Sequence, residues 1–215
     1  FSALKSLKNQ YANGYWNTAI GGQAMENDTS AYATVAVGFR ALRNPVKVSE
    51  STAIGVGAME SGDSTFWNVA VGRGAMFSMG NSNQNVAVGT WAMNHKKSGF
   101  YNNALGLFAL DLDSIGIGNV GIGTSALRNN KQSQENVGLG LNAGYYFSGT
   151  GAGQIGGNVF LGSYAGRGAT TGATGQFNNV MGYHALEKFT TANTNVAIGD
   201  YAMQENLRGT ESVAI

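Results

Sequence analysis

The hydrophobic and polar positions of this chain follow a repeated phrase. The stretch from Asn68 to Met76, NVAVGRGAM, returns 17 residues later as NVAVGTWAM, from Asn85 to Met93. A fixed period over many copies is typical of a stacked repeat array. Eight copies at this period begin at Asn17, Thr34, Ser51, Asn68, Asn85, Asn102, Asn119 and Asn136, and after insertions of five and three residues later copies begin at Asn158, Asn178 and Asn195, with a truncated copy at Ser212.

The columns of the repeat are unusually constant, and we number them from position 1, which is Asn68 in the copy above. Position 8 is alanine in all eleven complete copies, and position 4 is always apolar. Position 9 is methionine or leucine except at Gly144 and Gly166. A glycine at position 5 lets the chain turn through positive φ or pass close to a neighbouring backbone. These glycines are Gly21, Gly38, Gly55, Gly72, Gly89, Gly106, Gly123, Gly140, Gly162, Gly182 and Gly199.

Each copy predicts a short β-strand. Positions 1 to 4, as in NVAV, are rich in β-branched residues and are followed by a glycine, which favours a strand over a helix. A second short strand is expected over positions 6 to 9, and the polar, glycine-containing or aromatic positions 10 to 17 would close the coil. Stacking of coils at ~4.8 Å would form a continuous parallel ladder. The predicted fold class is therefore all-β, a parallel β-solenoid or β-roll of 17-residue coils, with the asparagine, serine and threonine side chains of position 1 forming a ladder at the corner.

The repeat divides the chain into three parts. Residues 1–16 are expected to form a partial preceding coil or a connector, and residues 17–144 to form eight regular coils. Residues 145–215 are expected to form further coils with two loop insertions, truncated at the last repeat. The insertions lie in Gly144–Gly157 and Gly166–Phe177, where we expect tolerated protrusions at least and contact loops at most.

Both faces of the predicted strand are apolar, which bears on the oligomeric state. Alternation places positions 2 and 4, as in Val69 and Val71, on one face and position 3, as in Ala70, on the other. The small residues in register at position 3 are what a close-packed second chain would require. A single solenoid with alanine-rich flat faces would leave an apolar patch well above the few hundred Å² that soluble monomers usually tolerate. Charged residues make up only 12% of the chain, where roughly 25% is typical. These observations favour a parallel homotrimer, with a lone solenoid as the alternative.

Composition removes several classes of partner. The net charge of +1 and the scattered basic residues give no electrostatic reason to expect a nucleic acid or an anionic membrane. The chain has no cysteine, which excludes disulfides and thiolate metal sites. Its longest apolar runs fall far short of the ~20 residues of a membrane helix. The sequence thus predicts no nucleic-acid partner and no membrane insertion.

Candidate reactive groups are few and scattered. His95 and His184 are the only histidines and lie in different coils, where we expect solvated loop positions. Asp111 and Asp113 offer too few oxygen ligands for a calcium loop. GIGNVG, Gly116–Gly121, fits a dinucleotide-binding pattern but lacks the following helix and the βαβ unit. The sequence therefore predicts no enzyme, no catalytic residue, no cofactor and no metal.

Aromatic residues are the strongest candidates for binding. Aromatic pairs precede position 1 in three of the coils and are skipped in the coils between them, so the repeat itself does not require them. Exposed rings there would stack on sugar faces or grip a protein receptor. The structural alternative is that the rings pack over the coil corner or across the seam of a trimer. The candidate receptor-contact residues are Tyr15, Trp16, Phe66, Trp67, Trp91, Phe100, Tyr101, Tyr145, Tyr146 and Phe147.

The nine-residue phrase resembles two related groups of repeats. One is the YadA-like Hep_Hag repeat in the heads of trimeric autotransporter adhesins, whose SVAIG core is also similar to ESVAI, Glu211–Ile215. The other is the NTAVGYQAL repeat of phage and viral tail fibres, which NTAIGGQAM, Asn17–Met25, follows closely. The resemblance covers about residues 17–215. It implies a trimeric, left-handed parallel β-roll on an extracellular or virion appendage, used for attachment.

The longer coil fits the viral fibres better than the autotransporter heads, whose coils are shorter. We therefore expect a structural and attachment segment of a trimeric viral (phage) fibre, a rigid shaft or head on the virion surface. Its expected partners are its own copies, a host cell-surface glycan or protein receptor, and other fibre or virion proteins. The alternatives are a bacterial trimeric autotransporter adhesin head on the cell surface and, less well supported because it would need convergent carboxylates, a polysaccharide-cleaving fibre enzyme.

Overall fold

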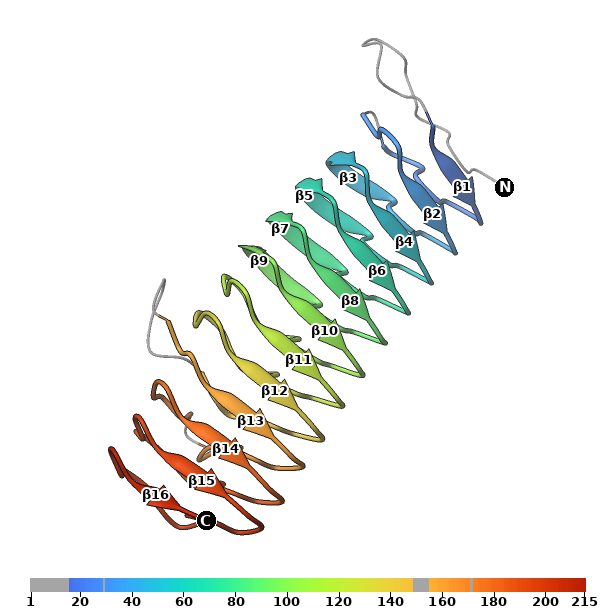
Figure 1. Cartoon of the computed structure of the whole chain (residues 1–215). Coiled ribbons are helices and arrows are strands. Elements are labelled where there is room, and N and C mark those ends of the chain that lie inside the picture. The colour runs from blue at the N-terminus through green and yellow to red at the C-terminus, as the bar shows by residue number, and fades with distance from the viewer. Residues whose placement is uncertain (1–15, 29, 149–154, 171) are drawn as a thin grey trace.

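The computed structural model describes residues 16–28, 30–148, 155–170 and 172–215. This part of the chain is an all-β parallel solenoid of about 11 turns with ~17 residues in each. Figure 1 shows the coils stacked one upon the next along a single axis, with β1 at one end and β16 at the other. The predicted solenoid and its period are confirmed.

One continuous sheet of twelve parallel strands runs the length of the rod. The register pairs equal repeat positions, as in Ala53 with Ala70, and it holds across the first insertion, where Val137 pairs with Val159. The strands are β1 (Thr18–Ile20), β2 (Val35–Val37), β4 (Thr52–Ile54), β6 (Val69–Val71), β8 (Val86–Val88), β10 (Asn103–Leu105), β11 (Val120–Ile122), β12 (Val137–Leu139), β13 (Val159–Leu161), β14 (Asn179–Met181), β15 (Val196–Ile198) and β16 (Val213–Ala214).

The second strand expected over positions 6 to 9 is wrong. Those residues form a turn, in which positions 7 and 9 both have positive φ, for example 61° at Gln23 and 51° at Met25. Because the turn lacks the alternation of a strand, Ala24 and Met25 are both fully buried. The interior of the coil is thus made from positions 3, 8 and 9, and positions 2 and 4 face outward. The opposite faces of the strand were predicted, but the alanines of position 3, expected to face a second chain, lie inside the roll.

A second sheet lies on the return side of four consecutive coils, where the sequence pattern predicts only coil closure. Its parallel strands occupy positions 11 to 16 and run in the order β3-β5-β7-β9. Every other described coil closes without an element of this length. The strands are β3 (Asn44–Ser49), β5 (Ser61–Phe66), β7 (Ser78–Asn83) and β9 (His95–Phe100).

Position 12 differs between the strand-bearing coils and four of the other coils. In four coils without the second strand, an Asp or Asn at this position accepts backbone N–H bonds from residues two or three ahead, as Asp113 Oδ1 does from Gly116 at 2.7 Å. Such local bonds compete with a strand ladder and bend the chain. The capped coils carry Asp28, Asp113, Asn130 and Asn206, and the strand-bearing coils carry Pro45, Gly62, Met79 and Lys96.

The predicted side-chain ladder at position 1 is confirmed. Asparagines from Asn68 to Asn195 are fully buried, and from Asn85 onward each donates its backbone N–H and its side-chain amide to the Oδ1 of the asparagine one coil earlier. The bond from Asn158 Nδ2 to Asn136 Oδ1, across the first insertion, is 2.9 Å. Satisfied amides are what allow so polar a column to lie inside the roll.

The two glycine exceptions at position 9 have a packing cause. Phe160 occupies the interior at position 3, where most coils have alanine. A Cβ on Gly144 would lie 2.9 Å from its ring, and a Cβ on Gly166 would lie 2.0 Å from it. The rings of Phe147 and Phe189, at 5.7 and 6.1 Å from Phe160, complete this aromatic core. One large ring therefore replaces two smaller side chains.

A buried ion pair joins the last strand-bearing coil to the capped coil that follows it. Lys96 Nζ lies 3.0 Å from Asp113 Oδ2 and donates to the Gly116 carbonyl at 2.9 Å, and both side chains are fully buried. Burial raises the pKa of Asp113 and lowers the pKa of Lys96, while the charge of each partner opposes that shift. The pair is satisfied only as a unit.

We predict that Gly89→Ala is far more destabilising than Gly57→Ala. Gly89 has φ of 137°, and a Cβ there would lie 2.5 Å from the Gly106 carbonyl oxygen. Gly57, at position 7, has φ of 65° and meets only flexible side chains. Thermal unfolding followed by circular dichroism should show a loss above about 3 kcal/mol for Gly89→Ala and about 1 kcal/mol for Gly57→Ala. Equal losses would contradict the close approach.

We predict that Lys96→Met costs about 3 to 5 kcal/mol, because it leaves the Asp113 carboxylate buried without its partner. Adding Asp113→Asn should restore most of the lost stability, since Met79 and Asn130 already occupy the same repeat position. Thermal midpoints of the two single variants and the double variant measure this coupling. A double variant as unstable as Lys96→Met alone would contradict the prediction.

Candidate receptor-contact surfaces

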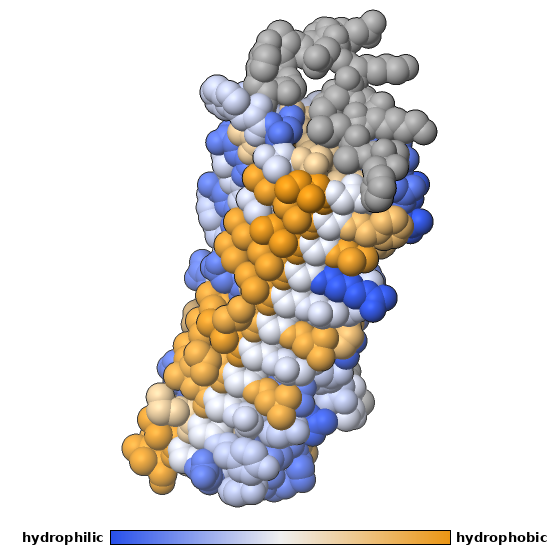
Figure 2. All heavy atoms as spheres, turned by 90° about the vertical axis from the view of Figure 1, so that its right-hand side faces the viewer, coloured by the Kyte–Doolittle hydropathy of each residue, from blue (hydrophilic) through white to orange (hydrophobic). Residues whose placement is uncertain are grey.

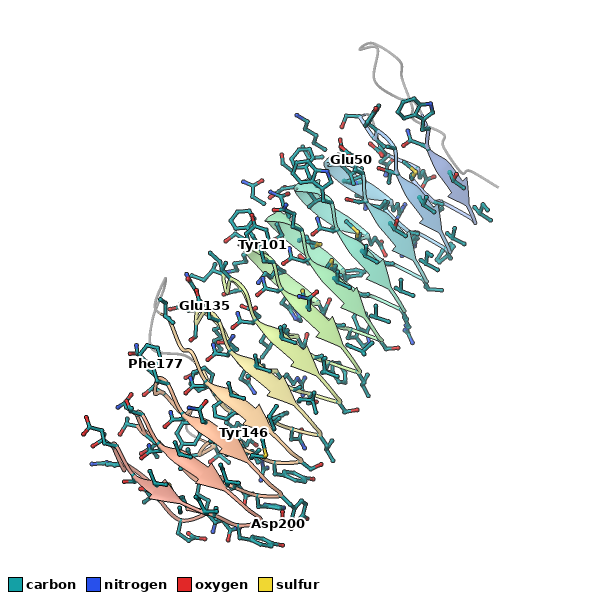
Figure 3. All side chains as sticks on the ribbon, in the orientation of Figure 1. Glu50, Tyr101, Glu135, Tyr146, Phe177 and Asp200 are labelled. Atoms are coloured by element: carbon teal, nitrogen blue, oxygen red, sulfur yellow. The ribbon has the colours of Figure 1, made fainter. Side chains whose placement is uncertain are left out.

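The residue just before position 1 forms a raised edge that we call the ridge. All twelve ridge residues have φ between 48° and 68°, although only two of them are glycine. Figure 3 shows Glu50, Tyr101, Glu135 and Phe177 along this one edge of the roll. The ridge comprises Trp16, Ala33, Glu50, Trp67, Gln84, Tyr101, Gly118, Glu135, Gly157, Phe177, Thr194 and Glu211.

Large aromatic side chains on the ridge stay about half or more open to solvent. A left-handed backbone costs an ordinary L-residue roughly 1 to 2 kcal/mol, and glycine avoids most of that cost. The exposed fractions are 77% for Trp16, 53% for Trp67, 58% for Tyr101 and 49% for Phe177. Each ring therefore presents a face that this chain does not cover and that a ligand or a second chain can contact.

The residues preceding Trp67 and Tyr101 support these two ridge aromatics. Phe66 and Phe100 are half-buried, with ring centroids 6.0 Å from Trp67 and 6.4 Å from Tyr101. Lys47 Nζ lies 5.6 Å from the centre of the Phe66 ring. These two aromatic pairs thus each consist of one supporting ring and one presented ring.

The remaining predicted contact residues lie elsewhere. Trp91 lies on the turn at position 7, where it is half-buried against Phe77 at 5.8 Å. Tyr145 and Tyr146 lie at positions 10 and 11, with their rings 4.6 Å apart. The prediction for Phe147 is wrong, because its ring is fully buried in the aromatic core around Phe160 and presents nothing to a receptor. Tyr15 lies outside the described residues.

The sequence pattern did not reveal a second aromatic cluster, on the turn of the last coils. The His184 ring stacks between Tyr164 at 4.6 Å and Tyr201 at 5.5 Å, with Tyr183 edge-on at 4.1 Å. His184 is therefore not the solvated loop residue that was predicted. The signal was an aromatic ring or histidine at position 7 in three successive copies.

Glu187 fixes that histidine. Its Oε2 lies 2.6 Å from His184 Nδ1 and accepts from Gln204 Nε2 at 2.9 Å. Partial burial alone would raise the pKa of Glu187, but the bonds from Gln204 and His184 hold it below its usual value. These contacts join neighbouring coils and have a structural role.

The other reactive groups also serve the fold. His95 is exposed as predicted, with Nδ1 3.1 Å from Asp111 Oδ1, and Arg128 Nε bonds the other oxygen of Asp111 at 3.2 Å. Gly116 gives its carbonyl to Lys96 and its N–H to Asp113, so GIGNVG lies within the coil-closing network. Among the described residues, no group of three or more His, Cys, Asp or Glu side chains is placed to hold a metal ion. That part of the chain also has no helix long and apolar enough to cross a membrane.

A second extended surface is the outer face of the twelve-stranded sheet. Exposed apolar side chains at positions 2 and 4 recur along it, and position 6 adds Val56, Leu107 and Leu141. Figure 2 shows a band of hydrophobic residues that runs along the length of the molecule. We call this band the apolar stripe, and its large exposed members at positions 2 and 4 are Ile20, Ile54, Val69, Val86, Leu105, Leu139, Met181, Ile198, Val213 and Ile215.

Comparison with models of protein families, with curated proteins and with solved structures found no match to this chain. The ridge and the apolar stripe are the two surfaces that bear on its function. The ridge presents separate rings on a narrow edge, whereas the apolar stripe is broad and continuous. The first suits a ligand, and the second suits another folded chain.

We predict that Trp67→Ala leaves the thermal midpoint of the chain nearly unchanged, whereas Phe147→Ala lowers its stability by about 3 to 5 kcal/mol. The first ring is exposed, and the second fills the aromatic core, where its removal leaves a cavity. Circular dichroism melting of both variants compares the two sites. A large loss for Trp67→Ala would place that ring among the structural residues.

Proposed function

We propose that this chain is a structural and attachment segment of a trimeric viral (phage) fibre. In this proposal the solenoid is a left-handed roll, and three copies pack in parallel to make a rigid shaft or head on the virion surface. The ridge and the loops at the insertions face the host cell, where they bind a surface glycan or a protein receptor. Other fibre or virion proteins continue the appendage, and the segment itself catalyses no reaction.

The apolar stripe is the observation that carries the proposal. It spans nearly every coil, and neither position 2 nor position 4 holds a charged residue in any copy. At ~4.8 Å per coil, the eleven coils make a rod on the order of 55 Å long. So long an apolar band exceeds what a soluble monomer usually exposes. Parallel copies related by a rotation axis along the rod would cover it with equivalent residues in every coil.

The choice of a viral fibre over a bacterial adhesin head rests on the coil. Both groups of repeats resemble the phrase at positions 1 to 9, but the 17-residue period and the two insertions favour the fibre. The genes beside the one that encodes this chain separate the two: tail or capsid genes support the fibre, and a membrane barrel in the same reading frame supports the adhesin.

The proposal predicts that the chain sediments as a trimer and that charges on the stripe break it. Leu105→Glu with Leu139→Glu should give a monomer with the same β-type circular dichroism, because the two substitutions would bury six unpaired carboxylates in a trimer. Val46→Glu is the matched control, since Val46 is 65% exposed on the second sheet and lies off the stripe. Sedimentation equilibrium measures the oligomeric state of the unmodified chain, the double variant and the Val46→Glu control. An unmodified chain that stays monomeric at high concentration would contradict the trimer.

Attachment is tested on the same trimers. Trp67→Ala should reduce their binding to cells that the intact particle infects, while sedimentation and the melting of the trimer stay unchanged. A variant that still attaches but melts at lower temperature would show that the ring belongs to the seam between chains.

A further inference from the structure

The ridge is most regular where the second sheet supports it. In those four coils, positions 16 and 17 alternate between polar and aromatic pairs: Ser49–Glu50, Phe66–Trp67, Asn83–Gln84 and Phe100–Tyr101. Position 16 ends each strand of the second sheet, so the ridge residue follows directly from a hydrogen-bonded element. The pattern therefore has a period of two coils on a rigid support.

We propose that this part of the ridge binds a linear, uncharged, β-linked polysaccharide that lies along the rod. The inference rests on the attachment function proposed above and narrows it to one chemical class of receptor. One sugar ring stacks on Trp67, the next lies over Gln84, and the next stacks on Tyr101. Glu50 extends the track by one more polar position.

The spacing of the ridge supports this ligand. Phe66, Asn83 and Phe100 are direct partners in the parallel register of the second sheet. At ~4.8 Å per strand, Trp67 and Tyr101 lie roughly 10 Å apart along the rod, with Gln84 midway. In an extended β-linked chain, successive sugars are turned over, so every second ring presents the same face. A ligand with that alternation meets a ring, an amide and a ring in turn.

The backbone holds the track in place before any ligand arrives. Trp67 N–H donates to the Ser49 carbonyl at 3.2 Å, and Gln84 N–H donates to the Phe66 carbonyl at 3.1 Å. The Asn83 side chain accepts from Phe66 N–H at 2.8 Å, which fixes the polar pair beside the aromatic one. A rigid aromatic platform loses little conformational entropy on binding. Such preorganisation favours the binding of a sugar chain, whose individual contacts are weak.

Charge and shape narrow the ligand class. Lys47 and Glu50 carry opposite charges beside the track, and no cluster of basic residues gathers there to hold a polyanion. The ridge is one residue wide and convex, whereas the hot spots of protein interfaces lie in packed, desolvated pockets. Aromatic faces flanked by amide and carboxylate groups match the apolar faces and hydroxyl edges of neutral sugars.

Binding is tested by the fluorescence of Trp67 in the otherwise intact chain. The variant Trp16→Phe with Trp91→Phe leaves Trp67 as the single tryptophan of the three in the chain. Cellohexaose or chitohexaose should cause a saturable change in its emission, whereas the α-linked, curved maltohexaose should not. Tyr101→Ala should weaken binding about tenfold. Phe177→Ala, which removes an exposed ring at the same repeat position in a coil without the second sheet, should leave the affinity unchanged.

A second variant tests the spacing at constant composition. Exchanging the pairs, with Phe66→Asn, Trp67→Gln, Asn83→Phe and Gln84→Trp, puts the two aromatic pairs in adjacent coils. We expect a loss of affinity above about tenfold, with an unchanged thermal midpoint. If the exchange also lowers the thermal midpoint, the difference in sugar affinity between Tyr101→Ala and Phe177→Ala tests the inference instead.

The inference is overturned if neither β-linked hexasaccharide binds, if maltohexaose binds equally well, if Tyr101→Ala has no effect, or if a correctly folded exchange variant keeps its affinity. Attachment to cells that depends on Trp67 and survives removal of surface glycans would point to a protein receptor and would also overturn it. Sedimentation of the same samples tests the trimer separately. A trimer that binds no sugar refutes this inference alone, and a monomer that binds sugar refutes only the trimeric fibre.

Discussion

The structure depends on how closely one coil can lie on the next. At position 5, the backbone runs through φ between 116° and 137°, and in ten coils a Cβ there would lie 2.3 to 2.7 Å from the backbone of the next glycine. Conformation and contact distance therefore both require glycine. This contact brings the strands of the long sheet into hydrogen-bonding distance and superposes the position 1 amides. The alanines at positions 3 and 8 are small because they share the interior of a flat coil with the methionine or leucine of position 9. Phe160 fits at position 3 because Gly144 and Gly166 make room for it.

The repeat was enough to predict the period, the strand at positions 1 to 4, the opposition of positions 2 and 4 to position 3 and the asparagine ladder, because each follows from identical residues superposing. The prediction failed at positions 6 to 9, where positive φ values replace the expected strand by a turn. Position 9 is methionine or leucine in nine copies, yet it lies in the left-handed region, where those residues are uncommon. The contacts between coils impose that conformation, and no local propensity reveals it. The second sheet was missed because the lack of an Asp or Asn cap at position 12 does not by itself mark it: the coil that begins at Asn178 has Phe189 at this position and forms no second strand.

The candidate site was predicted in part. The aromatic pairs before position 1 could be found from the sequence, because the repeat does not require them. Their exposure could not, since it depends on the positive φ that turns Trp67 and Tyr101 outward from the edge. Phe147 looked equivalent by composition but lies at position 12, inside the roll. A residue's place in the coil, more than its type, decides whether it meets solvent or core.

The asparagine column has one more consequence. The side-chain hydrogen bond from Asn158 to Asn136, which spans the longer insertion, is as short as those between regular coils. The long sheet keeps its register across the same insertion. Extra residues on the return side therefore leave the rise per turn unchanged. Loops on that side can therefore lengthen, shorten or be exchanged during evolution without altering the dimensions of the rod. Loop sequence and rod geometry can evolve independently.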